Sequence, residues 1–256
     1  MTIEEIRQYY NRIGLEYDEN EPRDIALLNK LQHAHVTTVP YENTEIVDRH
    51  PLSLEKADLF QKVVVEHRGG YCFELNGIFG DLLRSLGFEI TEHFGRFLRG
   101  ESEPPKPRHR VLAAYLGDKK YICDVGVGSK APRYPLLIAP GVEQEQFGEI
   151  YKIETDDFLG TVVTEKTENG FEPFFSFNDA PAINKDFITP SYYCENHPDS
   201  IFLVNMLSIK TDDGRYTIDK DVFKIWKDGN VIEEKQLDEA GLESVCRKYF
   251  GMELHR

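Results

Sequence analysis

RGGYCFELN, residues Arg68–Asn76, joins a glycine break directly to the apolar spacing of a helix, with one cysteine at the junction. The pattern predicts that Cys72 lies at the N-terminus of that helix, where unpaired N–H groups and the positive end of the helix dipole favour an anion. We therefore expect the thiol of Cys72 to ionise at a pKa below the roughly 8.5 of free cysteine, as a nucleophile does. The alternative is that Cys72 is a small buried apolar residue behind a turn that ends the preceding helix.

Helical periodicity surrounds this stretch on both sides. Upstream, apolar residues recur every three or four positions over residues 3–13 and 25–35, which predicts two amphipathic helices. Ser53 is expected to be the N-cap of a third helix, which runs to the glycine pair before Cys72. Downstream, apolar positions from Leu75 to Leu86 predict a fourth helix. Residues 1–88 are therefore expected to form a helical bundle that carries the cysteine.

From Phe88 the sequence changes to short β-rich runs separated by turn residues. The turn at Gly117 and Asp118 predicts a hairpin between two of these runs. The candidate strands are Phe88–Phe97, Arg110–Leu116, Lys119–Val125, Gln146–Glu154, Thr161–Thr167 and Phe171–Phe177. Short strands of this kind indicate a small antiparallel barrel over residues 89–190.

The last segment, residues 191–256, carries two successive hairpin signals and a final helix. Asp212-Asp213-Gly214 and Lys227-Asp228-Gly229 are turn sequences between strand-like runs. These runs are Phe202–Lys210, Arg215–Ile218, Val222–Trp226 and Val231–Glu233, and the helix is expected from about Asp238 to Tyr249. The expected fold class is α+β, with an N-terminal helical bundle, a central antiparallel β-barrel and a C-terminal α/β lid.

Composition and charge exclude several classes of protein. The chain has 256 residues and a formal net charge of −15, which argues against sequence-independent nucleic-acid binding because that depends on Lys and Arg. No apolar run approaches the roughly 20 residues that span a bilayer, so no membrane partner is expected. The N-terminus carries acidic residues where a signal peptide has basic ones, and we expect a cytoplasmic protein. The four cysteines lack zinc-site spacing, and no metal is expected.

A cysteine nucleophile needs a base that takes its proton and a third group that orients the base. His109 opens a candidate strand and Asp124 ends its hairpin partner, so the two are expected to lie roughly opposite each other. Taken singly, His109 is more simply a solvated loop residue and Asp124 a turn residue. Cys72, His109 and Asp124 in this order, on a helix and two strands, are typical of a papain-like thiol enzyme of the transglutaminase type.

RGGYCFELN resembles the RGGxCxELN signature of the arylamine N-acetyltransferases, and other motifs extend the resemblance over essentially the whole chain. Those motifs are His33-Ala34-His35, VPYEN at 39–43, HRVL at 109–112, DVGVG at 124–128 and the hairpin at 202–217. The resemblance implies a papain-like cysteine-enzyme core, a Cys72–His109–Asp124 triad and acetyl-CoA as co-substrate without a metal. It also implies ping-pong transfer of an acetyl group, through an acetyl-cysteine, to a small arylamine or hydrazine.

The sequence departs from the family pattern where substrate selection is expected. Val127 stands where the family commonly has an aromatic residue, Ser129 where a further glycine is frequent, and Tyr41 replaces the usual phenylalanine. With Tyr71, Tyr41 and Val127 are our candidates for the acceptor pocket. The alternative is that these aromatic residues belong to the core.

Charged and glycine residues near the motifs suggest further roles. Gly126 and Gly128 are candidates for close approach of CoA, or alternatively for a turn that needs a positive φ. Lys130, with Arg133 nearby, is the nearest basic candidate for the CoA pyrophosphate. Arg68 and Glu42 are expected to form a buried ion pair that braces the loop before Cys72, the alternative being two surface charges.

Three rival functions remain open from the sequence. A transglutaminase-like or thiol-protease activity shares the order Cys, His, Asp, but usually has an aromatic residue shortly after the histidine, where this chain has Arg110-Val111. A non-catalytic protein that holds CoA or an arylamine is disfavoured by the complete triad. A redox-sensing thiol is disfavoured because no resolving cysteine lies near Cys72 in the sequence.

Overall fold

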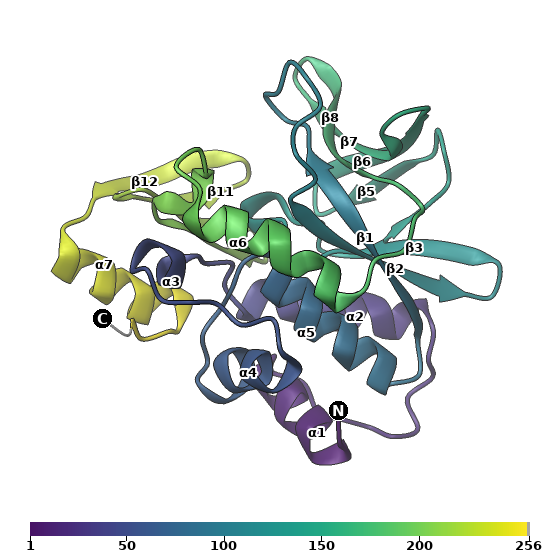
Figure 1. The fold of residues 1–256 in the computed structure, drawn as a ribbon, viewed down its shortest axis with the longest axis horizontal. Coiled ribbons are helices and arrows are strands. Elements are labelled where there is room, and N and C mark those ends of the chain that lie inside the picture. Colours follow the sequence, from purple (N-terminus) through teal and green to yellow (C-terminus); the bar gives the residue numbers. More distant parts are fainter. Residues whose placement is uncertain (255–256) are drawn as a thin grey trace.

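The computed structural model describes residues 1–254, and its N-terminal region is built from helices (Figure 1). They are α1 (Ile3–Arg12), α2 (Ile25–Thr38), α3 (Thr44–Val47), α4 (Lys56–Phe60), the π-helical turn η1 (Gln61–Val65) and α5 (Cys72–Ser85). The central helix is α5, which packs against α4 and against two strands of the barrel. The predicted helical region is confirmed, and Cys72 is the first residue of α5.

The third predicted helix begins later than the sequence indicates. Helix α4 starts at Lys56 and has Glu55 at its N-cap position. The Ser53 hydroxyl lies 2.5 Å from Asp58 Oδ2 and accepts the N–H of Glu55 at 3.2 Å. The prediction of an N-cap at Ser53 is wrong, because this hydroxyl stabilises the turn that precedes the helix.

The strands within residues 1–254 form two antiparallel sheets, and the larger is the barrel. Its eight strands follow the order β4-β3-β2-β1-β8-β7-β6-β5. They are β1 (Glu89–Phe97), β2 (His109–Leu116), β3 (Lys119–Cys123), β4 (Leu136–Leu137), β5 (Glu143–Gln146), β6 (Glu149–Asp156), β7 (Gly160–Thr167) and β8 (Gly170–Phe177). The sheet curls around an apolar core that includes Val111, Tyr151 and Phe175. The α+β class and the antiparallel barrel are confirmed.

Two glutamine side chains close the seam between the edge strands β4 and β5. The Gln144 amide accepts from Leu137 N–H at 2.8 Å and donates to Leu137 C=O at 2.9 Å. The Gln146 amide makes the same pair of bonds with Tyr134, at 2.8 and 3.0 Å. Each amide therefore pairs with the edge backbone as a neighbouring strand does.

The run expected as one strand over Gln146–Glu154 is two strands. β5 ends at Gln146 and β6 begins at Glu149, with a tight turn at Phe147 and Gly148 between them. Both turn residues have a positive φ, 51° at Phe147 and 78° at Gly148. The prediction missed this turn because phenylalanine rarely adopts that conformation and carries no turn signal.

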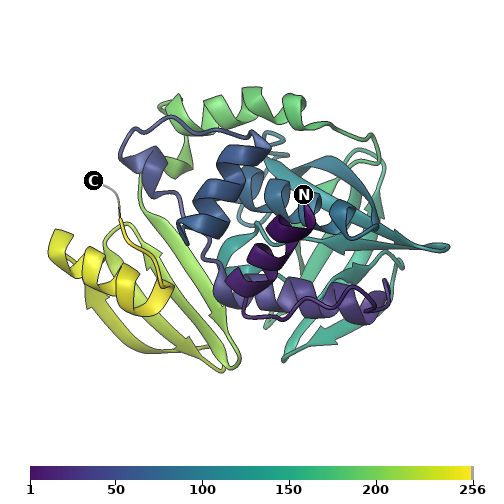
Figure 2. The ribbon, with the colours of Figure 1, turned by 90° about the horizontal axis from the view of Figure 1, so that it is seen from below.

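The smaller sheet lies at the C-terminal side and has the order β12-β11-β10-β9. Its strands are β9 (Met206–Thr211), β10 (Gly214–Asp219), β11 (Val222–Lys227) and β12 (Asn230–Gln236). Helix α7 (Glu239–Val245) and the π-helical turn η5 (Cys246–Phe250) cover one face (Figure 2). Both predicted hairpins and the final helix are confirmed, although β9 begins at Met206 because residues Ile201–Leu203 form a 3-10 turn, η4.

A helical connection links the barrel to the smaller sheet. It consists of η3 (Asn184–Phe187), α6 (Ile188–Asn196) and η4, and α6 crosses the molecule beside the start of α5 (Figure 1). The expected boundary between residues 190 and 191 therefore falls inside α6. Within residues 1–254, none of the helices combines the length and the apolar character that crossing a membrane requires.

Candidate active site

Cys72 is fully buried at the first turn of α5. The residue before it, Tyr71, is extended and forms the N-cap, and its N–H donates to the Glu74 carboxylate at 3.1 Å. The Cys72 side chain is 0 % exposed, and its thiol donates to the Arg108 carbonyl oxygen at 3.7 Å. Because Arg108 directly precedes His109, this contact brings the thiol to the start of β2.

His109 and Asp124 form a short hydrogen bond at the end of the β2–β3 hairpin. His109 Nε2 lies 2.6 Å from Asp124 Oδ2, and both side chains are fully buried. The His109 ring is held between Phe97 and Phe175, at centroid distances of 4.5 and 5.7 Å. Its other nitrogen, Nδ1, is buried and has no hydrogen-bond partner within residues 1–254. Nδ1 is therefore the atom of the ring left to exchange a proton.

Asn76 ties the cysteine helix to the aspartate. It lies one turn after Cys72, and its Nδ2 donates to Asp124 Oδ1 at 2.8 Å and to the Arg110 carbonyl at 2.6 Å. Its Oδ1 accepts the Val125 N–H at 2.9 Å. Sequence reasoning did not single out this residue, although a polar side chain four positions after Cys72, on the same helix face, was a signal.

Gly126 gives the chain after Asp124 room to pass the nucleophile. Its N–H donates to Asp124 Oδ1 at 2.9 Å. A Cβ at this position would stand 2.7 Å from the Cys72 Cα and 2.9 Å from Asn76 Nδ2, closer than atoms of this kind approach. The absence of a side chain thus allows Cys72, Asn76 and Asp124 to share one small volume.

The ionisation expected for Cys72 is not what its surroundings favour. Burial raises the pKa of the Cys72 thiol well above its usual value, and the negative charge of Asp124 raises it further. Hydrogen bonds from the Arg110 and Phe73 backbone oppose these effects only in part. The expected lowering is therefore corrected: the helix N-terminus alone does not outweigh desolvation, and an anion here needs a base that takes its proton.

The three residues expected in the acceptor pocket have different surroundings. Tyr71 is fully buried, and its hydroxyl lies 2.6 Å from Ser191 Oγ on α6. Tyr41 bridges Gly70 and Ser208 through its backbone, and its side chain packs on the apolar cluster that contains Cys72. Val127 is partly buried where the barrel core meets the helical core.

Of the residues expected to hold CoA, Gly126 lies against Cys72, whereas Gly128 and Lys130 lie beside the smaller sheet. Gly128 has a φ of +76° and opens the 3-10 turn η2 (Gly128–Lys130), where a Cβ would meet Ser208 and Tyr41 at 3.3 to 3.4 Å. The Lys130 side chain is 36 % exposed and pairs with Glu165 at 3.0 Å. The predicted need for a positive φ is thus met at Gly128.

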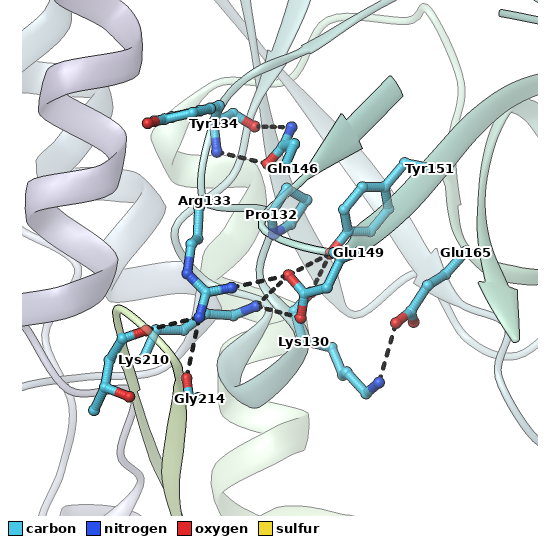
Figure 3. A network of polar contacts seen from close by, with 12 residues as sticks. Lys130, Pro132, Arg133, Tyr134, Gln146, Glu149, Tyr151, Glu165, Lys210 and Gly214 are labelled. Carbon is cyan, nitrogen blue, oxygen red and sulfur yellow. Dashed lines mark hydrogen bonds and ion pairs between the residues drawn. The ribbon is translucent and has the colours of Figure 1, made fainter. Parts of the chain in front are cut away.

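Arg133 is committed to a buried polar network (Figure 3). It pairs with Glu149 at 3.1 Å and donates to the Thr211 and Gly214 carbonyls at 2.7 and 3.1 Å. Lys210, on β9, contacts the same Glu149 carboxylate at 2.8 Å. Since Glu149 lies on β6, this network fastens the smaller sheet to the barrel. It also leaves the Arg133 side chain, only 4 % exposed, with little capacity for a phosphate.

The buried ion pair expected from the sequence is present. Arg68 Nη2 lies 3.0 Å from Glu42 Oε1, with the two side chains 2 % and 0 % exposed. Thr44 donates its N–H and its hydroxyl to the other oxygen of Glu42, at 2.8 and 2.6 Å. The pair thus joins the segment before α3 to the loop that leads into Cys72.

A cavity of about 460 Å³ lies next to the site but does not reach it. It opens between residues 46–55 and α6, and Ser191 and Glu195 form part of its wall. Of the described residues, those that line this cavity do not include Cys72, His109 or Asp124. The triad is covered by the residues around it.

The sequence and the fold both match known acetyltransferases. A family described as N-acetyltransferase matches residues 24–256. The chain is 30 % identical over 256 residues to the arylamine N-acetyltransferase of Mycolicibacterium smegmatis, covering 96 % of this chain and 91 % of that one. The chain belongs to the arylamine N-acetyltransferase family. It is therefore an acyltransferase.

Further members of the family agree in sequence and in structure. The arylamine N-acetyltransferase of Escherichia coli is 29 % identical over 236 residues, covering 90 % of this chain and 83 % of that one. The solved structure of the Salmonella typhimurium enzyme has a TM-score of 0.93 at 23 % identity, over 100 % of this chain and 93 % of that one. That of the Mycobacterium marinum enzyme in complex with CoA has a TM-score of 0.87 at 26 % identity, over 96 % and 92 %.

Proposed function

We propose that this acyltransferase moves an acetyl group from acetyl-CoA to a small arylamine or arylhydrazine through an acetyl-Cys72 intermediate. The observation that carries the proposal is the His109 ring, which is bonded to Asp124 through Nε2 while Nδ1 has no hydrogen-bond partner within residues 1–254. This is the arrangement a papain-like cysteine enzyme needs, with one ring nitrogen oriented and the other free for proton transfer. A relative solved with CoA supports the choice of acyl donor.

The first half-reaction begins with a proton transfer. Because burial raises the pKa of Cys72, the thiolate forms only as its proton passes to His109, and Asp124 stabilises the resulting imidazolium. The sulfur then attacks the thioester carbonyl of acetyl-CoA, the bond from carbonyl carbon to the CoA sulfur breaks, and CoA leaves with the proton from His109. We assign the Cys72 backbone N–H at the start of α5 as a donor to the developing oxyanion.

The second half-reaction uses the same groups in reverse. The amine nitrogen attacks the acetyl carbon, His109 accepts a proton from that nitrogen, and the bond to the Cys72 sulfur breaks. Arylamines suit this step because they are neutral near pH 7 and therefore nucleophilic. A thioester intermediate suits it as well, since exchange between two thioesters is nearly isoenergetic and leaves the acetyl group reactive.

Because Cys72 is fully buried, substrates must displace some of the residues that cover it to reach its sulfur atom. The network around Glu149 ties the smaller sheet to the barrel, so we assign the opening to α6 and η4 and to the loop before His109 (Figure 3). Val127, Tyr41 and Tyr71 then line the space for the acceptor. Gly128 and Lys130, at the surface beside β9, face the approach of CoA.

Intact mass spectrometry after incubation with acetyl-CoA tests the proposal. We expect the parent chain to gain one acetyl group and to release CoA, whereas Cys72→Ala gains none. Cys123→Ala serves as a matched control, because Cys123 is also fully buried and lies next to Asp124. Adding an arylamine should remove the acetyl group and yield the N-acetyl product. An unmodified parent chain, or acetylation that survives in Cys72→Ala, would refute the mechanism.

A further inference from the structure

Cys72 shares its apolar surroundings with a second cysteine from a distant part of the chain. Cys72 on α5 and Cys194 on α6 belong to one buried cluster, both are 0 % exposed and both are reduced. Cys123 belongs to the core between helices and barrel, and Cys246 to the core under the smaller sheet. The fold therefore supplies what the linear sequence did not show, a second thiol in the buried cluster that contains the nucleophile.

Contacts around the two thiols keep α6 against the start of α5. The Tyr71 hydroxyl lies 2.6 Å from Ser191 Oγ, which in turn donates to Glu195 at 2.8 Å. Ser191 and Cys194 are three positions apart and therefore lie on the same buried face of α6. Tyr71 directly precedes Cys72, so one hydrogen bond joins the two segments that carry the thiols.

Arg108 neighbours both sulfur atoms. Its carbonyl oxygen accepts from the Cys72 thiol at 3.7 Å. Burial raises the pKa of Cys194 to about 12, and the positive charge of Arg108 opposes that rise. Cys194 is thus a thiol at neutral pH, whereas Cys72 has the His109–Asp124 pair to take its proton. The two thiols differ in reactivity, and Cys72 is the one that an oxidant attacks first.

We propose that Cys194 is the resolving cysteine of Cys72, and that a hydroperoxide converts the pair into a disulfide. The inference rests on the proposed function, because it uses Cys72 as the reactive thiol. In the first step the Cys72 sulfur displaces water or alcohol from the peroxide oxygen and becomes a sulfenic acid. In the second step the Cys194 sulfur attacks that sulfur, and the sulfenic oxygen leaves as water with the Cys194 proton. Two thiols are oxidised and one peroxide is reduced.

The disulfide protects the nucleophile from irreversible loss. A sulfenic acid that is not resolved is oxidised further to a sulfinic acid, which thiol reductants do not restore. A disulfide between α5 and α6 blocks acetyl transfer only until a thiol reduces it. The segment that moves to admit acetyl-CoA also admits a peroxide, which is smaller.

Mass spectrometry and recovery of activity test this proposal together. The parent chain, Cys194→Ser, Cys194→Ala and the control Cys246→Ser are treated with hydrogen peroxide and then with dithiothreitol. In samples taken after the peroxide and before the dithiothreitol, we expect the parent and Cys246→Ser to have lost two hydrogen atoms and to yield a peptide that joins residues 72 and 194. Both Cys194 variants should instead gain oxygen atoms at Cys72. Relative to its own untreated activity, each should recover at least about tenfold less than the parent.

Two results would overturn the proposal. One is oxygen gain without loss of two hydrogen atoms in the parent chain, or a disulfide that joins Cys72 to another cysteine. The other is equal recovery of activity in the parent and both Cys194 variants. Acetylation by acetyl-CoA is measured on the same untreated samples, so failure of the acetyl-cysteine mechanism is recognised separately from failure of the disulfide.

Discussion

Asn76 Nδ2 lies 2.8 Å from Asp124 Oδ1, so the helix that carries the nucleophile also holds the carboxylate that orients the base. Through this one side chain, α5 and the β2–β3 hairpin form a single site. The relationship makes Asn76 a positioning residue, since it acts on His109 through Asp124.

We expect Asn76→Ala to lower kcat by roughly 100-fold, because a small misplacement of the base has effects of this size. It should also shift the pH dependence of Cys72 alkylation by iodoacetamide to higher pH, because a less well oriented His109 accepts the proton less readily. The matched control is Asn43→Ala. Asn43 is also buried and holds Phe202, Val204 and Met206 through its amide.

Both variants should lose about 1–3 kcal/mol of unfolding free energy, since each leaves buried polar groups unsatisfied. An unchanged pH profile in Asn76→Ala, or an equal shift in Asn43→Ala, would show that Asn76 is merely structural.

Glu42→Gln should destabilise the chain by about 3 kcal/mol, because it removes the nearer carboxylate from buried Arg68 and leaves only Glu45, at 3.8 Å. Burial raises the pKa of Glu42, but the charges of Lys62 and Arg68 and hydrogen bonds from Thr44 outweigh it, so the net pKa lies below its usual range. Activity should fall as well, since the pair braces the loop before Cys72. Thermal unfolding followed by circular dichroism measures the stability.

The exposed pair of Lys227 and Asp213 provides the control for Glu42. Its side chains are 53 % and 55 % exposed, and Asp213→Asn should leave the Tm unchanged because solvent screens such pairs. If Glu42→Gln and the parent chain have the same Tm, the buried pair does not brace the loop before Cys72.

His35 should make the fold sensitive to acid. Burial lowers the pKa of His35 from 6.5 to about 3, and the charge of Arg12 adds to the effect. Between these two pH values the unfolded chain binds a proton that the folded chain does not. Stability is therefore lost as the pH falls from 6.5, with a slope of about 1.4 kcal/mol per pH unit from this group.

Denaturant titrations between pH 4 and 7 measure that slope. His35→Gln keeps a polar partner for the Tyr9 hydroxyl, which lies 2.9 Å from His35 Nδ1, but does not titrate. This variant should lose stability less steeply than the parent, and exposed His50→Asn should not differ from the parent. Parallel slopes for all three proteins would mean that His35 titrates normally in the fold.

Gly126→Ala should reduce activity by at least roughly 100-fold, because the new Cβ would lie 2.7 Å from the Cys72 Cα and displace the nucleophile. Gly80→Ala, in α5, is the comparison, since its Cβ would meet the flexible end of the Leu112 side chain on β2 at 3.2 Å. Steady-state rates measure the activity of each variant, and a melting curve measures its stability, so damage to the active site is distinguished from unfolding. Full activity in Gly126→Ala would show that this close approach is dispensable.

Local patterns in the sequence were sufficient to predict most of the elements and the pairing of His109 with Asp124. The turn at Gly117 and Asp118 sets the hairpin register, so His109 and Asp124 could be expected at the same end, and the structure joins them at 2.6 Å. The glycine break and the apolar spacing likewise identified the helix that begins at Cys72.

Contacts between distant segments were not predictable from such patterns. Asn76 bonds to Asp124 and Lys210 pairs with Glu149 across separate regions of the chain. Cys72 shares a buried cluster with the distant Cys194. No periodicity of the sequence predicts these arrangements. The predicted lowering of the Cys72 pKa was wrong for the same reason, because the degree of burial depends on which distant segments cover the end of the helix.

The glutamine seam of the barrel has a consequence for behaviour at high concentration. Edge strands with free peptide groups recruit strands from other molecules and so begin ordered aggregation. Here the amides of Gln144 and Gln146 occupy the peptide groups of Leu137 and Tyr134, and both strands at the seam are short. The barrel is thereby protected at this seam against intermolecular sheet extension without a fully closed ring of strands.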